Sequence, residues 1–275
     1  MMAAAHSCNA EIMPESVRVE LAGSTATVTL HRPDVHNAFD DALIATLGDA
    51  LRSLADQDRV RALVLTGSGS TFSAGADLNW MRRMVRASEA DNRADALRLA
   101  ALLRTLNDFP KPTIARVNGS AYGGGVGLVA CCDIAIGVDS AKFALSEVKL
   151  GLVPATIAPY VVEAIGVRQA RRLFVTGEVF DAAEAARIGL LHLCVAPERL
   201  DEAIDRQLHF IRKGGPVAQR EAKHLALRLG GPAVDRGQRS DVENAELIAR
   251  LRVSPEGQAG LSAFLEKRSP EWARH

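Results

Sequence analysis

The stretch from Ile114 to Asp133, IARVNGSAYGGGVGLVACCD, constrains the fold more than any other part of the chain. Its apolar start, closed by Asn118-Gly119, predicts a short strand that ends in a turn. Three glycines, Gly123 to Gly125, then lead into an apolar stretch with the small residues of a buried helix. Such a turn lets backbone N–H groups at a helix start approach a ligand closely. Glycines also serve tight packing alone, so the triplet by itself does not indicate a binding site.

The composition is that of a globular chain without a strongly charged partner. The 275 residues are 48% hydrophobic and 24% charged, which is enough for a large core. Lys+Arg and Asp+Glu both number 33, so no net charge favours a nucleic acid or a membrane surface. No apolar run reaches about 18 residues, so no membrane span is expected. The four cysteines form no CxxC pair and have no histidine at ligand spacing, so we expect a reducing, cytoplasmic setting and no metal site.

The order of the predicted elements indicates a mixed α/β core with a helical C-terminal part. Residue patterns predict a hairpin over 17–30, a helix over 39–54 and a buried strand over 61–66. Further on they predict a helix over 92–106, short strands over 133–138 and 142–145, and mainly helices after 160. We therefore expect a flexible N-terminal extension over residues 1–15, an α/β core over 16–205 and a helical region over 206–275.

Five motifs, in this order, resemble those of the crotonase, or enoyl-CoA hydratase/isomerase, superfamily. They are HRPDVHNAF, FSAGADL, NGSAYGGGVGLVACCDIAI, LSEVKLGLVP and FLEKRSPEW, and the resemblance runs from about Val17 to Trp272. The ordered set is far more specific than any one motif. It implies a spiral of ββα units with a C-terminal helical region that mediates trimers, often paired into hexamers. The wider pattern looks like bacterial hydratases that act on methylglutaconyl-type CoA esters in leucine and isoprenoid breakdown.

The resemblance implies an acyl-CoA thioester as substrate, so coenzyme A arrives with the substrate and no separate cofactor is expected. Family members stabilise a thioester enolate with two backbone N–H groups, which map to Ala76 and to Gly124. Preorganised donors in a water-poor site suit a developing oxyanion. Because the backbone supplies these donors, we expect substitutions at both positions to be tolerated when the backbone keeps its place.

The two catalytic glutamates of family hydratases map to Glu147 and to Gly127, and a glycine cannot transfer a proton. Glu147 must then act alone or with a group that the motifs do not identify, and an apolar pocket would raise its pKa as acid–base work requires. Three functions stay open: an enoyl-CoA hydratase, a Δ3-Δ2 isomerase that needs Glu147 alone, and an inactive protein that binds CoA esters. We expect Gly127 to open room for a larger or branched acyl group.

The resemblance also assigns residues to coenzyme A. It places two segments along the pantetheine and adenine, one with Val35 and His36 and the other with Ala74, Ala76, Asp77 and Leu78. Lys267 resembles a residue that meets a CoA phosphate, sometimes in a neighbouring subunit, although a lysine at a helix end is equally expected from the helix dipole.

A dicarboxylic substrate would need a cation for its second carboxylate. Arg82, Arg83 or Lys149 could supply it, and for each the alternative is a solvated surface charge. The expected partners are the acyl-CoA substrate and further copies of the chain in a homotrimer or homohexamer, with neither nucleic acid nor membrane.

Overall fold

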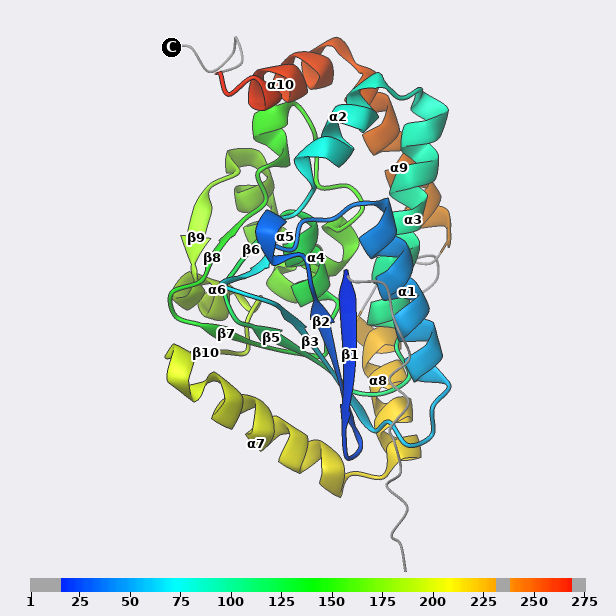
Figure 1. The fold of residues 1–275 in the computed structure, drawn as a ribbon, viewed down its shortest axis with the longest axis vertical. Coiled ribbons are helices and arrows are strands. Elements are labelled where there is room, and N and C mark those ends of the chain that lie inside the picture. Colours follow the sequence, from blue (N-terminus) through cyan, green and yellow to red (C-terminus); the bar gives the residue numbers. More distant parts are fainter. Residues whose placement is uncertain (1–15, 231–237, 269–275) are drawn as a thin grey trace, which may run out of the picture.

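The structure, a computed structural model, describes residues 16–230 and 238–268. The expected extension over residues 1–15 lies outside the described residues, as do residues 231–237, part of the stretch after 160 where mainly helices were expected, and Trp272 in the last motif. Two β-sheets form the centre of the described chain, and helices surround them (Figure 1).

The larger sheet has six strands in the order β1-β2-β3-β5-β7-β10. They are β1 (Val17–Ala22), β2 (Thr25–Leu30), β3 (Ala62–Gly67), β5 (Thr113–Val117), β7 (Ile134–Val138) and β10 (Leu193–Val195). The predicted hairpin is confirmed, because β1 and β2 pair antiparallel, whereas the other neighbours pair in parallel. Every residue of β3 is buried, as expected for an apolar strand between two parallel neighbours.

The smaller sheet has the order β4-β6-β8-β9 and explains how the chain repeats. Its strands are β4 (Thr71–Ser73), β6 (Ser120–Tyr122), β8 (Lys142–Ala144) and β9 (Val179–Asp181). The pairs β3 and β4, β5 and β6, and β7 and β8 each place one strand in each sheet, and helices follow each pair. This repetition confirms the expected ββα spiral.

Side chains cap the first turns of several of the described helices. The helices are α1 (Asp41–Ala55), α2 (Leu78–Arg86), α3 (Glu89–Asn107), α4 (Gly124–Ala130), α5 (Ala158–Thr176), α6 (Ala182–Ile188), α7 (Leu200–Lys213), α8 (Pro216–Gly230), α9 (Gln238–Val253) and α10 (Pro255–Leu265), with 3₁₀ helices η1 (Pro33–Val35), η2 (Glu147–Leu150) and η3 (Pro197–Arg199). Asp40 caps α1 by accepting a hydrogen bond from the backbone N–H of Leu43. Ser88 and Asp91 form a reciprocal capping box that starts α3.

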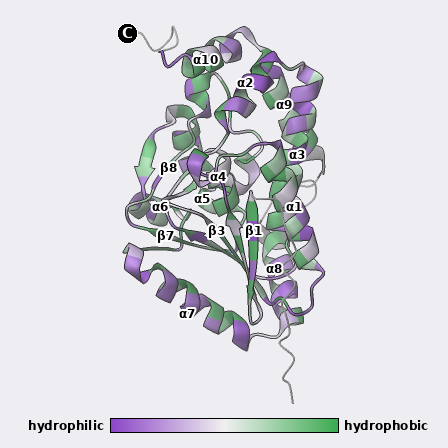
Figure 2. Cartoon of the chain, in the orientation of Figure 1, coloured by the Kyte–Doolittle hydropathy of each residue, from purple (hydrophilic) through white to green (hydrophobic). Residues whose placement is uncertain are grey.

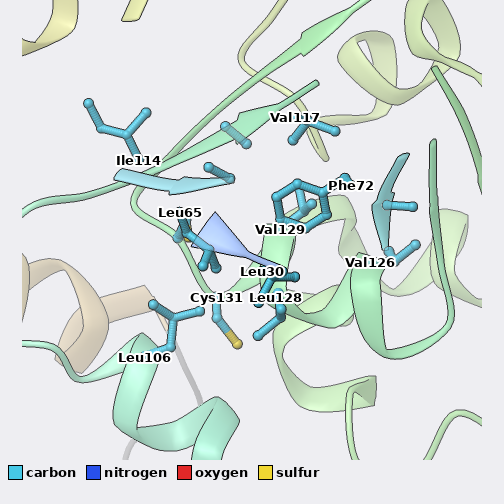
Figure 3. Packing of buried hydrophobic residues seen from close by; sticks show 14 of the residues in the cluster. Leu30, Leu65, Phe72, Leu106, Ile114, Val117, Val126, Leu128, Val129 and Cys131 are labelled. Carbon is cyan, nitrogen blue, oxygen red and sulfur yellow. The ribbon is translucent and has the colours of Figure 1, made fainter. Parts of the chain in front are cut away.

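The helix that follows the glycine triplet lies at the centre of the core. Val126, Leu128 and Val129 of α4 are at most 1% exposed and pack among side chains from the sheet and from α3 (Figure 3). The predicted buried helix is therefore confirmed, and the strands around it are mostly hydrophobic (Figure 2). Its depth means that residues at its start are held rigidly.

The C-terminal helices α7, α9 and α10 pack on two different parts of the core. α7 crosses the face of the larger sheet opposite α4 and packs on β5 and β7 (Figure 1). The expected boundary between residues 205 and 206 falls inside this helix. α9 packs along α3, and α10 contacts α2 and η2, so these two helices cover the end of the core where the smaller sheet lies. No described helix is long and apolar enough to cross a membrane.

Candidate active site

A mostly apolar cavity of about 280 Å³ is lined in part by residues of α2, α9 and α10. Its walls bring together Ala76 from the turn before α2, Gly123 and Gly124 from the start of α4, and Glu147 from η2. These residues are far apart in the chain and meet because consecutive strands of the smaller sheet end side by side. A mostly apolar cavity with a few converging polar groups is the usual form of a small-molecule site.

Ala76 presents a free backbone N–H to this cavity. Phe39 forms a parallel β-bridge with Ala76. The N–H of Phe39 donates to the carbonyl of Gly75 at 2.6 Å, and the carbonyl of Phe39 accepts from the N–H of Asp77 at 2.8 Å. In such a bridge the N–H and C=O of the residue between the two partners, here Ala76, point away from the facing strand. The N–H of Ala76 donates to no described residue, so it is available to a ligand in the cavity.

The start of α4 presents a second free donor. Gly123 has φ +49° and ψ −117°, which a residue with a Cβ rarely adopts, and this turn directs the chain from β6 into α4. Gly124 is the first residue of the helix, so its N–H has no partner within the helix and donates to no other described residue. The two expected oxyanion donors thus line one cavity.

The packing of Gly124 corrects the expectation that substitutions are tolerated there. A Cβ at this position would lie 2.6 Å from Cε2 and 2.9 Å from Cδ2 of Phe39. Phe39 is 1% exposed, and its backbone holds the Ala76 turn, so the ring cannot yield without moving the other donor. Glycine is therefore the residue that fits at position 124, between the start of α4 and the ring of Phe39.

Glu147 places a carboxyl group beside these donors. A Cβ at Gly123 would lie 3.3 Å from Oε1 of Glu147, so the carboxyl adjoins the start of α4. The residue as a whole is half-buried, but its Oε2 is shielded from solvent and has no hydrogen-bond partner among the described residues. Burial raises the pKa of Glu147 to about 7. A hydrogen bond from the backbone of Glu147 itself lowers this pKa, but by less than burial raises it. Such a group exchanges protons near neutral pH.

Arg32 joins the segments that carry the donors. Its Nη2 lies 2.9 Å from Oδ2 of Asp40 and 3.0 Å from Oδ2 of Asp77, and its Nη1 donates to the carbonyl of Ala38. Asp77 caps α2 by accepting from the N–H groups of Asn79 and Trp80. Burial alone would raise the pKa of Asp77, but the Trp80 and Asn79 N–H groups and Arg32 outweigh it, so that pKa is lowered. Asp77 therefore braces the Ala76 turn.

Gly127 does not open the cavity, so that expectation is wrong. A Cβ there would lie 2.4 Å from Cγ2 and 2.9 Å from Cβ of Ile157, and 3.4 Å from Cδ2 of Leu103. Gly127 is not among the residues that line the cavity, whereas Ile157 is. Ile157 fills the space beside the glycine, and a glutamate at 127 could not be accommodated unless Ile157 moved.

The residues assigned to coenzyme A lie at and beside the cavity. Ala74 and Ala76 line it, and the N–H of Ala74 donates to the carbonyl of His36 at 2.9 Å. Val35, His36 and Leu78 are exposed and do not line the cavity. The two segments therefore lie together at the surface next to Ala76, where a long substrate could continue. The His36 Nδ1 lies 3.1 Å from Thr71 Oγ1.

The expected cations differ in position. Arg83 pairs with Asp41 at 2.8 Å, and Arg82 donates to Asn79 at 2.7 Å; neither lines the cavity. Lys149 does line it, although its side chain is exposed. Lys267 is exposed just beyond α10, three residues after Phe264, which lines the cavity.

Sequence reasoning missed a buried polar group in the cavity wall. The Nε1 of Trp80 donates to Oδ1 of Asp95 at 3.3 Å, and Nη1 of Arg252 lies 3.4 Å from Oδ2 of the same carboxylate. Trp80 and Arg252 line the cavity. The one signal in the sequence was an aspartate on the apolar face of the helix over 92–106; nothing singled out Arg252.

The family model for enoyl-CoA hydratase/isomerase matches residues 20–275. The chain belongs to the enoyl-CoA hydratase/isomerase family. A solved enoyl-CoA hydratase of Shewanella pealeana is 42% identical, with a TM-score of 0.79, and the match covers 97% of this chain and 100% of that one. A crotonyl-CoA hydratase of Syntrophomonas wolfei is 31% identical over 92% of this chain and 96% of its own. A short-chain-enoyl-CoA hydratase of Clostridium acetobutylicum is 30% identical over 93% and 97%.

In this member of the enoyl-CoA hydratase/isomerase family, the cavity presents backbone donors and one carboxyl. Among the described residues, no group of three or more His, Cys, Asp or Glu side chains is placed to hold a metal ion. Cys131 and Cys132 are buried, and burial raises the pKa of both thiols, to about 12 for Cys132. They pack in the core of this family member as small hydrophobic residues.

Proposed function

We propose that this family member is an enoyl-CoA hydratase, a lyase that adds water across the α,β double bond of a 2-enoyl-CoA thioester. The observation that carries the proposal is the meeting of two free backbone N–H groups, on Ala76 and Gly124, with the carboxyl of Glu147 in one apolar cavity. The hydratase names of the relatives support the same reaction. Coenzyme A is part of the substrate, and no separate cofactor is proposed.

In the proposed reaction the thioester oxygen accepts hydrogen bonds from the Ala76 and Gly124 N–H groups. The Glu147 carboxylate takes a proton from water while the water oxygen bonds to the β-carbon, and the electrons of the double bond move onto the thioester as an enolate. Glu147 then returns the proton to the α-carbon. One O–H bond breaks, a C–O and a C–H bond form, and the carboxylate is restored. Each N–H donor of this kind typically lowers the activation barrier by about 3–4 kcal/mol.

Double-bond isomerisation is the second candidate, because Glu147 is the only acidic residue among the described residues that line the cavity. An isomerase shuttles one proton between carbons and needs no bound water. A single carboxyl and the same oxyanion donors would suffice for it.

Labelled water separates the two reactions. We expect that incubation with crotonyl-CoA in ¹⁸O-labelled water yields a 3-hydroxyacyl-CoA that carries the label on its β-hydroxyl oxygen. A shift of the double bond without uptake of ¹⁸O, measured by mass spectrometry with a 3-enoyl-CoA as substrate, would establish the isomerase instead. Tight binding of acyl-CoA without turnover of either substrate would establish the third possibility, an inactive CoA-ester-binding protein.

The acyl group of the substrate is proposed more finely as a branched, methylglutaconyl-type chain. Support comes from the sequence pattern around Gly124 and Glu147 and from cations in the cavity wall. The space at Gly127 lends no support, since Ile157 occupies it. Comparing kcat/KM across a panel of linear, branched and dicarboxylic enoyl-CoAs tests this choice.

A trimer or a pair of trimers is proposed for the assembled protein. Exposed apolar side chains of the described chain, such as Phe210 at 55%, Val217 at 62% and Leu225 at 47%, lie in the helical region over 206–275, to which the family resemblance assigns the subunit contacts. Sedimentation is expected to give the mass of three or six chains. A monomer at micromolar concentration would contradict the proposal.

A further inference from the structure

A cation in the wall of the cavity has no role in the chemistry proposed above. Arg252, near the end of α9, lines the cavity between α2, α3 and α9, and its side chain is 14% exposed. The neighbouring parts of the wall are apolar, with Met84, Leu99 and Ile248. A buried guanidinium group is costly to keep unless anions or dipoles compensate its charge.

The charges around Arg252 leave an excess of positive charge. Its acidic partner, Asp95, is 1% exposed and also pairs with Arg98 at 3.0 Å, so one carboxylate faces two guanidinium groups. The Nε1 of Trp80 donates to that same carboxylate. Asp95 does not itself line the cavity, and Glu147, the only carboxyl among the described residues that do, is largely protonated below about pH 7 because burial raises its pKa. Among the described residues that line the cavity, no carboxyl other than that of Glu147 is available to compensate the charge of Arg252.

The hydrogen bonds of Arg252 leave one edge of its guanidinium group free. Among the described residues, only its Nη1 has partners, Oδ1 of Asn92 and Oδ2 of Asp95, both at the long distance of 3.4 Å. The Nε and Nη2 groups donate to no described residue. The guanidinium carbon lies 5.6 Å from the centre of the Trp80 ring, which helps to fix its orientation. The Nε–Nη2 edge is one of the forks with which arginine binds a carboxylate through two parallel hydrogen bonds.

We propose that Arg252 binds a carboxylate at the far end of the acyl chain, so that the substrates are 2-enoyl-CoA thioesters that end in a carboxylate. The inference rests on the proposed function, because it takes the acyl chain to extend from the Ala76 and Gly124 donors past Trp80. A phosphate of coenzyme A has the same anionic oxygens. The nucleotide is too large for a cavity of about 280 Å³ and must reach solvent, so an arginine packed on the buried Trp80 suits the acyl end.

The test compares two substrates that differ only at the far end. Glutaconyl-CoA ends in a carboxylate, and 2-pentenoyl-CoA has a methyl group in its place. We expect the wild-type kcat/KM to be at least about tenfold higher for glutaconyl-CoA. Arg252→Gln should lower kcat/KM for glutaconyl-CoA by about 10- to 100-fold and change that for 2-pentenoyl-CoA by less than about threefold. Arg252→Lys keeps the charge but loses the two parallel donors, so its kcat/KM for glutaconyl-CoA should lie between those of the wild type and of Arg252→Gln.

Arg250→Gln is the matched control, because Arg250 is exposed on the same helix and does not line the cavity. It should leave both substrates unchanged. Equal losses on the two substrates in Arg252→Gln, or no wild-type preference, would overturn the proposal in favour of a structural ion pair with Asp95. If Arg252→Gln lost as much affinity for free coenzyme A as it loses in kcat/KM for glutaconyl-CoA, the proposal would be overturned in favour of a phosphate contact.

A binding measurement covers the case in which Arg252→Gln does not fold. Inhibition of the wild-type protein, or direct binding if it is inactive, is compared for glutaryl-CoA and pentanoyl-CoA, which are saturated. We expect glutaryl-CoA to bind at least about tenfold more tightly, and equal affinities would overturn the proposal. Absence of hydration with every enoyl-CoA would contradict the proposed function alone, since the binding comparison needs no turnover.

Discussion

Glu147→Gln should lower turnover by about 10²–10⁴-fold, the range that general acid–base catalysis usually supplies, with little change in affinity for the acyl-CoA. Glutamine keeps the shape of the side chain beside Gly123 but cannot exchange a proton. Steady-state kinetics with crotonyl-CoA and equilibrium binding of butyryl-CoA measure the two effects separately. Retention of more than about a tenth of the activity would move the proton transfer to another group.

The same substitution should change the pH dependence. Burial raises the pKa of Glu147 from 4.5 to about 7, so the wild-type hydration rate should rise through about pH 7 as the carboxylate forms, and the variant should lack this inflection. A raised pKa means that the folded protein holds the proton more tightly than the unfolded chain does. The stability associated with the protonated group is therefore fully present below about pH 4.5 and is lost as pH rises to about 7.

Above pH 7 the buried carboxylate should cost on the order of 3 kcal/mol of folding free energy. Glu147→Gln is therefore expected to be more stable than wild type at pH 8, and the difference should shrink towards pH 4.5. Chemical denaturation at the two pH values measures it. Glu198→Gln is the control, because Glu198 is an exposed glutamate in another 3₁₀ helix, η3. An unchanged stability difference between pH 4.5 and 8 would show that Glu147 is not buried as its surroundings indicate.

Gly124→Ala should lower kcat by about 10²–10³-fold, the usual effect of losing one oxyanion donor. The new methyl group would lie 2.6 Å from Cε2 of Phe39, so either the start of α4 or Phe39 must move. A shift of the helix displaces the Gly124 N–H, and a shift of Phe39 displaces the Ala76 turn bonded to it. Overpacking of this kind typically costs 1–3 kcal/mol, so the fold should survive.

Two companion variants make this result interpretable. Gly48→Ala places a methyl group inside α1, where the nearest atom is the flexible end of Arg52 at 3.3 Å, so its activity should match wild type. Phe39→Leu introduced into Gly124→Ala removes the ring that causes the clash and should recover at least about tenfold of the lost activity. Activity of Gly124→Ala within about threefold of wild type would mean that the donor pair does not stabilise the reaction.

Local pattern was enough to predict several of the elements, and the family resemblance supplied the expected site residues. The alternation over 17–30, the apolar run of β3 and the glycine turn into α4 each reflect interactions between residues close in the chain, so the hairpin, the buried strand and the buried helix were predicted correctly. The motifs around Ala76, Gly124 and Glu147 likewise named residues that the fold brings to one cavity. The helix α2 is not among the helices predicted above, because it buries only Trp80 and so lacks a regular apolar face.

Packing between distant segments decided what local pattern could not. The sequence by itself determined that residue 127 is a glycine, but only the tertiary structure showed that Ile157, thirty positions later, fills the space beside it. The same holds for Phe39, which makes glycine obligatory at 124, and for Arg252, which reaches the cavity because α9 packs on α3. A residue's type follows from the sequence, whereas the volume and charge around it depend on which remote side chains the fold places there.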